Sequence, residues 1–349
     1  MSKELLFKYP QITSWTWTAA TFAVLENYEN AKAWLYNNFT QLFCEQYENW
    51  VSLHYIPHVE VFSNTPFFKS ALINRELISA LQIDIINFVK KNIDLGYYVY
   101  CKVDEGYISR KKRFLHELII FGYEDATESF RIADFTLTKS QKYTFSSTSY
   151  QNFKKAYESV QIEEDDMQDG IGGDGGVLIF SVNEDCEYQF DLNALIVSLE
   201  DYLRCSDSGK LYRVHDLNKE SSFSRGLKEV CYGLDIYDRV IKYYKNVKKG
   251  ENQFYIQPLH VLFDYHVLMV KRLEYLKREN IANISDNIYR KYLELSKEVE
   301  IIRNLGIKYW LTQEENEIDK IIRALPRIKG KDKIYVEGLL HELNTIRNQ

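Results

Sequence analysis

The stretch Leu95–Phe135 constrains the fold of this chain most strongly. It contains three apolar, β-branched and aromatic segments bounded by turn residues, a pattern typical of β-strands. The first is Tyr97–Val103, the second is opened by His116, and the third ends at Asp134. Only a short Tyr-Glu-Asp turn separates the second segment from the third, so these two are expected to form an antiparallel hairpin.

This hairpin is expected to bring His116 and Asp134 together, since both lie at the end away from the turn. A carboxylate beside an imidazole fixes its tautomer and stabilises the imidazolium, as in the supporting half of a nucleophilic triad. The alternative is a structural histidine beside an edge-strand aspartate. The spacing alone leaves both interpretations open.

The composition is that of a globular protein with a substantial core. The chain has 349 residues, of which 45% are hydrophobic and 27% are charged, enough for one large domain or two ordinary ones. The net charge of −6 argues against a general nucleic-acid-binding protein, which needs a concentrated basic face. No apolar stretch approaches the length of a membrane span and no signal-peptide core is visible. We therefore expect a cytoplasmic protein with no membrane partner.

The cysteine and histidine patterns do not indicate a metal site. The five cysteines are scattered, odd in number and without a CxxC pair, which fits a reduced compartment. His54 and His58 flank Pro57 in an extended segment, and no further ligands follow with zinc-site spacing. The acidic, glycine-rich segment Glu163–Gly176 lacks the residues of a phosphate-binding or calcium-binding loop and is interpreted as a surface loop. No metal or cofactor is expected.

The stretch Leu95–Phe135 resembles the His- and Asp-bearing strands of papain-like, bacteriocin-processing cysteine peptidases, in which a Gly-Tyr-Asp-like turn joins the two strands. It is most similar to the branch that includes the N-terminal domain of butirosin biosynthesis protein H and related proteins near nonribosomal peptide and polyketide genes. Gln257–Leu276 also looks like the helical C-terminal part of the butirosin-type proteins. The resemblance implies a papain-like α+β fold and transfer of an acyl group from a carrier-protein thioester to an amine.

The resemblance also implies a nucleophilic cysteine at the N-terminus of the first helix, and this chain has none there. A helix is expected from Trp15 onward with Ser14 as its N-cap, and no thiol lies near its start. Gln11 lies a few residues upstream, as the oxyanion-hole glutamine does in papain-like enzymes. A hydroxyl is a weaker nucleophile than a thiolate, and the candidates for that role are Ser14, Thr16 and Thr18.

Cys44 is the alternative nucleophile, because it is the only cysteine in the N-terminal third. It lies in Ala31–Tyr47, whose apolar residues from Trp34 to Phe43 follow helical spacing. A cysteine beside an apolar stripe and away from a helix start lacks activation by the helix dipole. The competing interpretation is a small buried hydrophobic residue.

Two domains are expected, a papain-like α+β domain over residues 1–210 and a helical module over residues 211–349. In the first domain, Leu72–Lys91 is predicted to be helical. From Ser222 the apolar residues follow helical spacing almost without a break. A capping box from Thr312 to Glu315 predicts a further helix that stops at Pro326, and Asp332 is predicted to cap the next one.

The sequence is compatible with two functions. The first is an acyltransferase of antibiotic biosynthesis, with His116 as base, Asp134 as its orienter and amides at the start of the first helix as the oxyanion hole. Its partners would be an acyl or peptidyl carrier protein and a small amine. The alternative is a catalytically inactive papain-like relative that binds a carrier protein, a synthetase or a small metabolite. Proteolysis, a third interpretation, needs the missing thiol most directly.

Overall fold

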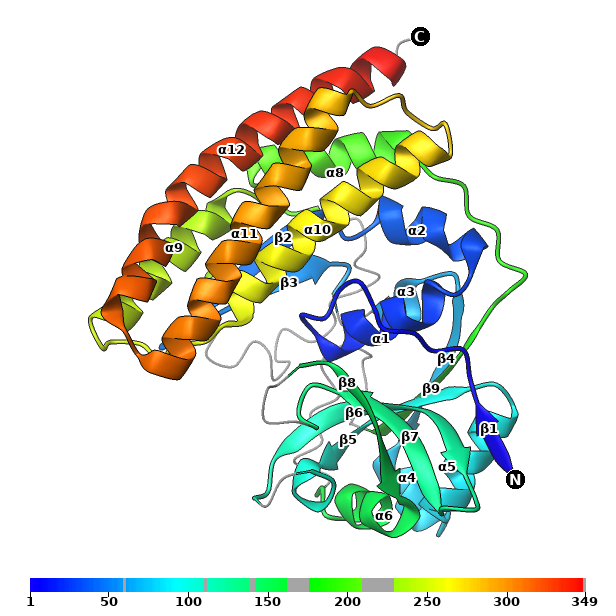
Figure 1. Cartoon of the computed structure of the whole chain (residues 1–349). Coiled ribbons are helices and arrows are strands. Elements are labelled where there is room, and N and C mark those ends of the chain that lie inside the picture. Colours follow the sequence, from blue (N-terminus) through cyan, green and yellow to red (C-terminus); the bar gives the residue numbers. More distant parts are fainter. Residues whose placement is uncertain (59–60, 110–111, 138–141, 162–175, 209–228, 348–349) are drawn as a thin grey trace. The chain divides into compact units, whose positions relative to one another are not determined.

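The computed structural model of the chain (Figure 1) describes residues 1–58, 61–109, 112–137, 142–161, 176–208 and 229–347. These residues form antiparallel sheets and helices and end in a helical region, which confirms the predicted α+β class. Contacts divide the chain into two compact units. Unit 1 contains the described residues of 1–31 and 59–187, and unit 2 contains those of 32–58, 188–219 and 223–349.

The two units are not consecutive in sequence, in contrast to the single boundary near residue 210 expected above. Segments 32–58 and 188–208 belong to unit 2 because their residues bond to its C-terminal helices. The Arg272 guanidinium donates to the main-chain carbonyls of Tyr36 and Asn38, at 2.7 Å each. The Tyr202 hydroxyl donates to the Asp332 carboxylate at 2.6 Å. Such contacts between distant segments leave no trace in local periodicity.

Unit 1 is built on one antiparallel sheet. Its strands follow the order β4-β9-β5-β6-β7-β8, and β1 pairs with β6. The three strands expected within Leu95–Phe135 are present as β5, β6 and β7. The bounds of the seven strands are β1 Ser2–Glu4, β4 Phe68–Asn74, β5 Tyr98–Asp104, β6 Leu115–Glu124, β7 Ser129–Asp134, β8 Thr144–Ser149 and β9 Gly176–Val182.

Helices pack on both faces of this sheet. On one face, Val99, Cys101 and Val103 of β5 join a buried apolar core with α4 (Arg75–Ala80), α5 (Ile85–Asp94) and α6 (Tyr150–Glu158). Alternate residues of β5 face the other way. There the Tyr100 ring lies 5.2 Å from the ring of Phe62 in α3 (Val61–Asn64), and its hydroxyl donates to Thr16 of α1 (Thr16–Leu25) at 2.8 Å. Short 3-10 turns occupy Glu29–Ala31 (η1) and Glu105–Tyr107 (η2).

Two local predictions in unit 1 were wrong. The single helix predicted over Leu72–Lys91 is the end of β4 followed by two helices, because the chain turns at Gln82 with φ of 51° and restarts at Asp84, whose carboxylate caps α5. The N-cap of α1 is Trp15, without a side-chain hydrogen bond, and not Ser14. The segment predicted as an acidic surface loop lies outside the described residues except for Gly176.

Unit 2 combines a small sheet with long helices. Its antiparallel strands β2 (Gln41–Gln46), β3 (Val51–Ile56) and β10 (Glu229–Tyr232) follow the order β10-β2-β3. Figure 1 shows α10, α11 and α12 side by side, as their contacts require. The helices are α2 Lys32–Asn37, α8 Leu192–Arg204, α9 Asp235–Lys248, α10 Gln257–Arg278, α11 Asp286–Thr312 and α12 Glu315–Arg347.

Two predictions in unit 2 also were wrong. The helix expected over Ala31–Tyr47 ends at Asn37, since Phe39 has φ of 56° and the chain then enters β2. The two helices expected around Pro326 are one helix, α12, which continues through the proline. Asp332 is therefore not a cap: it is fully buried inside α12 and accepts hydrogen bonds from two tyrosine hydroxyls. Within the described ranges, no helix is long and apolar enough to cross a membrane.

Candidate functional site

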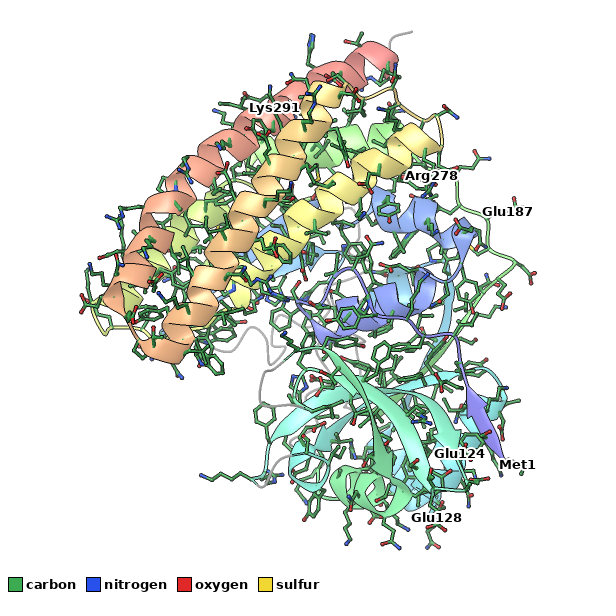
Figure 2. The ribbon with its side chains drawn as sticks, in the orientation of Figure 1. Met1, Glu124, Glu128, Glu187, Arg278 and Lys291 are labelled. Atoms are coloured by element: carbon green, nitrogen blue, oxygen red, sulfur yellow. The ribbon has the colours of Figure 1, made fainter. Side chains whose placement is uncertain are left out.

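His116 and Asp134 are in contact, as the hairpin predicted. The imidazole Nδ1 of His116 lies 3.0 and 3.1 Å from the two carboxylate oxygens of Asp134. His116 is the second residue of β6 and Asp134 is the last residue of β7. Figure 2 shows Glu124 and Glu128 at the other end of this hairpin, beside Met1. The contact is therefore made where the sequence placed it, at the end away from the turn.

The Asp134 carboxylate is held in place by more than the imidazole. Its side chain is fully buried, and Oδ2 accepts hydrogen bonds from the main-chain N–H of Thr136, at 3.2 Å, and from the Thr136 hydroxyl. These donors fix the carboxylate and satisfy part of its hydrogen-bonding capacity. A buried, positioned carboxylate can in turn orient the imidazole.

The contacts of His116 determine its tautomer. Nδ1 faces two acceptors, the Asp134 carboxylate and the main-chain carbonyl of Glu117 at 3.1 Å. Neither can donate a proton in a hydrogen bond when the carboxylate is ionised, so Nδ1 carries hydrogen. In the neutral imidazole the lone pair is then on Nε2, the nitrogen that remains for a substrate. The side chain is 26% exposed, which leaves it accessible.

The electrostatic environment favours the imidazolium. Burial alone lowers the pKa of His116, but the charge and the hydrogen bond of Asp134 outweigh burial, and with smaller effects of Glu117 and Glu105 they raise this pKa from 6.5 to about 9. His116 is therefore mostly protonated at neutral pH. It becomes a competent base only when the pH approaches 9 or when a bound substrate weakens the contact with Asp134.

Glu105 is a third ionisable member of this cluster, and the sequence analysis missed it. It follows β5, is fully buried, and accepts a hydrogen bond from the Ser109 hydroxyl at 2.9 Å. Burial, followed by the negative charge of Asp134, raises the pKa of Glu105 to about 7. A signal was present in the sequence, since Glu105 comes directly after the strand that was expected to neighbour His116. Its burial next to the pair could not be read from that position.

The aromatic ring of Phe114 covers one side of the imidazole. The two rings are stacked at 18° with centroids 5.7 Å apart. Phe114 is 39% exposed, so it forms part of the accessible surface next to His116. The candidate site thus consists of the His116–Asp134 pair, the Glu105 carboxyl group and an exposed aromatic side chain.

The start of α1 contacts β5, the strand that pairs with β6. Thr16, the first residue of α1, accepts a hydrogen bond from the Tyr100 hydroxyl of β5 at 2.8 Å. The negative charge of Asp134 contributes to the raised pKa of Tyr100, after the larger effect of burial. That amides at the start of the first helix serve as an oxyanion hole for a substrate at His116 stays a prediction.

The weaker candidates from the sequence also lie near α1. Gln11 is in the segment before this helix, where its main-chain N–H donates to the Glu26 carboxylate at 3.3 Å. Ser14 lies two residues before Thr16. Thr18, inside α1, is fully buried. The grouping of Gln11 and Ser14 with His116 stays a prediction.

Cys44 belongs to unit 2 and lies in strand β2, not near a helix end as expected. It is 1% exposed. Burial raises the pKa of its thiol, which opposes formation of a nucleophilic thiolate. Cys44 therefore has neither the location nor the electrostatics that the sequence analysis required of a nucleophile.

Metal chemistry has no donor set to support it in the part of the chain that the structure describes. No group of three or more His, Cys, Asp or Glu residues there could hold a metal ion.

Neither a protein-family model nor a curated protein matches this sequence. Functional assignment consequently depends on the geometry of the His116 site: a positioned imidazole with one nitrogen available and a carboxylate that stabilises its charged form. Such a site can accept and return a proton.

Proposed function

We propose that unit 1 has a papain-like fold and transfers an acyl group from a carrier-protein thioester to an amine, as an enzyme of nonribosomal peptide or polyketide antibiotic biosynthesis. The observation that carries this proposal is the buried Asp134 carboxylate in contact with Nδ1 of His116. This contact leaves Nε2 as the proton acceptor. The resemblance of the hairpin to the papain-like branch described above supports the choice of substrates.

In the proposed step, His116 acts as general base and then as general acid. The amine nitrogen attacks the thioester carbonyl carbon, a C–N bond forms and the C–S bond breaks. Nε2 takes the proton that the amine loses and delivers it to the departing thiolate, while Asp134 stabilises the transient imidazolium. Since a thioester is already an activated acyl donor, this route requires no covalent enzyme intermediate and no thiol on α1.

The proposed mechanism has a defined pH dependence. Because the pKa of His116 is raised to about 9, the fraction of free enzyme with a neutral imidazole increases tenfold for each pH unit below that value. The value of kcat/KM should rise with pH and level off near pH 9. At neutral pH most of His116 would be protonated, which would explain a low rate without any change in the fold.

The direct test is formation of an amide from an acyl thioester of N-acetylcysteamine, a mimic of the carrier-protein arm, and a panel of primary amines at pH 9. We expect His116→Gln to lower the amide-forming rate by about 100-fold or more, the usual contribution of a positioned base. His260→Gln provides a matched control, since His260 is a partly exposed histidine in unit 2. Equal rates for the wild-type protein and His116→Gln would contradict the proposal.

A second candidate is a non-catalytic protein that binds a carrier protein, a synthetase or a small metabolite. It is favoured by the residues at the start of α1, which are Ser14, Trp15 and Thr16 with no thiol among them. It predicts saturable binding of an acylated carrier protein, measured by calorimetry, with no amide product over the whole pH range. Turnover that depends on His116 would exclude it.

A further inference from the structure

Two cysteines from distant parts of the chain lie opposite each other in the small sheet of unit 2. The antiparallel register of β10 and β2 pairs Cys231 with Cys44, and the pairing continues to Gly233, whose N–H donates to the Leu42 carbonyl at 2.9 Å. Directly opposite residues in antiparallel strands have Cα atoms about 4.5 to 5.5 Å apart. Disulfides usually span about 4.4 to 6.8 Å between Cα atoms, so the Cα separation expected at this position lies within the range of a disulfide.

The side chains of the pair share one face of the sheet with a cation. Residues 44 and 46 of β2 and residues 229 and 231 of β10 point to the same side, because side chains alternate along each strand. Arg239 of α9 reaches this side, where its guanidinium donates to Gln46 and lies 2.5 Å from the Glu229 carboxylate. A guanidinium next to a thiol favours the thiolate.

The two thiols have different roles in such a pair. A hydrogen bond from Cys44, followed in importance by the positive charge of Arg239, lowers the pKa of Cys231 against the opposing effect of burial. Cys44 is almost completely buried, which raises its pKa. Cys231 is partly exposed. It is therefore the thiol that meets an oxidant first, and Cys44 is the one that resolves the intermediate.

We propose that Cys44 and Cys231 form a reversible, oxidant-sensitive disulfide that joins β10 to β2. With a low-molecular-weight disulfide as oxidant, the Cys231 thiolate attacks one of its sulfur atoms, which forms a mixed disulfide and releases one thiolate. The Cys44 thiol loses its proton to that thiolate, and the Cys44 thiolate then attacks the Cys231 sulfur and releases the second small thiolate, which is protonated by solvent. Two protein thiols are oxidised and one small disulfide is reduced to two thiols. In a reducing compartment such a bond is transient.

The test uses the full-length, reduced protein and glutathione disulfide. After incubation the reaction is quenched in acid, remaining thiols are alkylated with N-ethylmaleimide, and the protein is digested without reductant for mass spectrometry. We expect loss of two of the five thiols, a cross-linked peptide that contains Cys44 and Cys231, and loss of this peptide after dithiothreitol. Cys186, a partly exposed cysteine of unit 1, serves as an internal control for non-specific oxidation.

Two variants separate a specific disulfide from general thiol reactivity. Cys231→Ser should abolish the cross-link and leave Cys44 reduced, whereas Cys205→Ser should form the cross-link at the wild-type rate. Two outcomes would overturn the proposal. In the first, Cys231 carries glutathione while Cys44 stays reduced and is therefore alkylated by N-ethylmaleimide. In the second, Cys186 reacts while Cys44 and Cys231 remain reduced. Both of these outcomes can be read in the wild-type protein, so the test does not depend on the folding of a variant.

Discussion

Replacement of Asp134 by asparagine should largely remove the pH dependence of stability that His116 imposes on unit 1 above pH 6.5. In the wild-type protein the pKa of His116 is raised from 6.5 to about 9. A group with a raised folded-state pKa stabilises the fold fully below its unfolded value, near 6.5, and this contribution is lost as the pH rises through about 9. In Asp134→Asn the burial that lowers the pKa of His116 is opposed only by the smaller effects of Glu117 and Glu105. The decrease in stability between pH 6.5 and pH 9 should then largely disappear.

The magnitude follows from the two pKa values. The difference between 6.5 and about 9 corresponds to roughly 3 kcal/mol, at about 1.4 kcal/mol for each tenfold change in proton affinity. The His116 side chain is 26% exposed, and solvent screens part of its interaction with Asp134. We therefore expect the wild-type protein to lose about 1–2 kcal/mol of unfolding free energy between pH 6.5 and pH 9.5 through this histidine.

The assay is urea unfolding, monitored by tryptophan fluorescence at closely spaced pH values from 6 to 9.5. The free energy of unfolding of Asp134→Asn is subtracted from that of the wild-type protein at each pH. A control variant, Glu158→Gln, removes a carboxylate that is 57% exposed and pairs only with Lys154 at 3.8 Å among the contacts described; it should give a flat difference. A flat difference for Asp134→Asn as well would refute the assignment of a raised pKa to His116.

Three further predictions use the same unfolding assay. Because the pKa of Glu105 is raised to about 7, its charged form destabilises the fold as the pH rises from 4.5 through 7. The free energy of unfolding of Glu105→Gln should therefore increase by about 1–3 kcal/mol relative to the wild-type protein between pH 5 and pH 8. A constant difference would contradict this. Arg272→Met should lose about 2–4 kcal/mol because it leaves buried main-chain carbonyls without their donor, whereas Lys271→Met, at a side chain 42% exposed, should change stability by less than about 0.5 kcal/mol. Pro326→Ala should stabilise α12 by about 1–3 kcal/mol, since it restores an N–H donor inside the helix; no gain would show that neighbouring turns already accommodate the proline.

The contact between His116 and Asp134 could be predicted because it depends on local order. Two strands joined by a short turn leave one antiparallel pairing in which both apolar faces are buried, and this brings the two residues to the same end. The raised pKa of Glu105 could not be predicted in the same way. It results from the complete burial of that side chain, and burial at a strand end is decided by η2 and the residues after β7, which lie further along the chain.

The errors in unit 2 have a common physical cause, which is that tertiary contacts override local preference. Leu42 and Phe43 continue the apolar spacing of α2, yet Phe39 adopts a positive φ and the following residues pair as a strand with β3 and β10. Pro326 is a strong local stop signal, but the buried residues Leu325 and Ile328 on either side of it keep α12 in one piece. In both places the burial of apolar side chains outweighs the preference of one residue.

The catalytic and the structural interpretations of His116 differ in one measurable respect, the pH at which each property changes. If the imidazole serves only to anchor the strand ends, its titration near pH 9 changes the free energy of unfolding and no rate. If it is the base for acyl transfer, the same ionisation must appear in kcat/KM with the same midpoint, because both report the free protein. Asp134→Asn should then move both midpoints together to a lower pH, since one carboxylate controls one imidazole. A shift in stability without a shift in the rate profile would assign His116 to the fold and leave the chemistry to another residue.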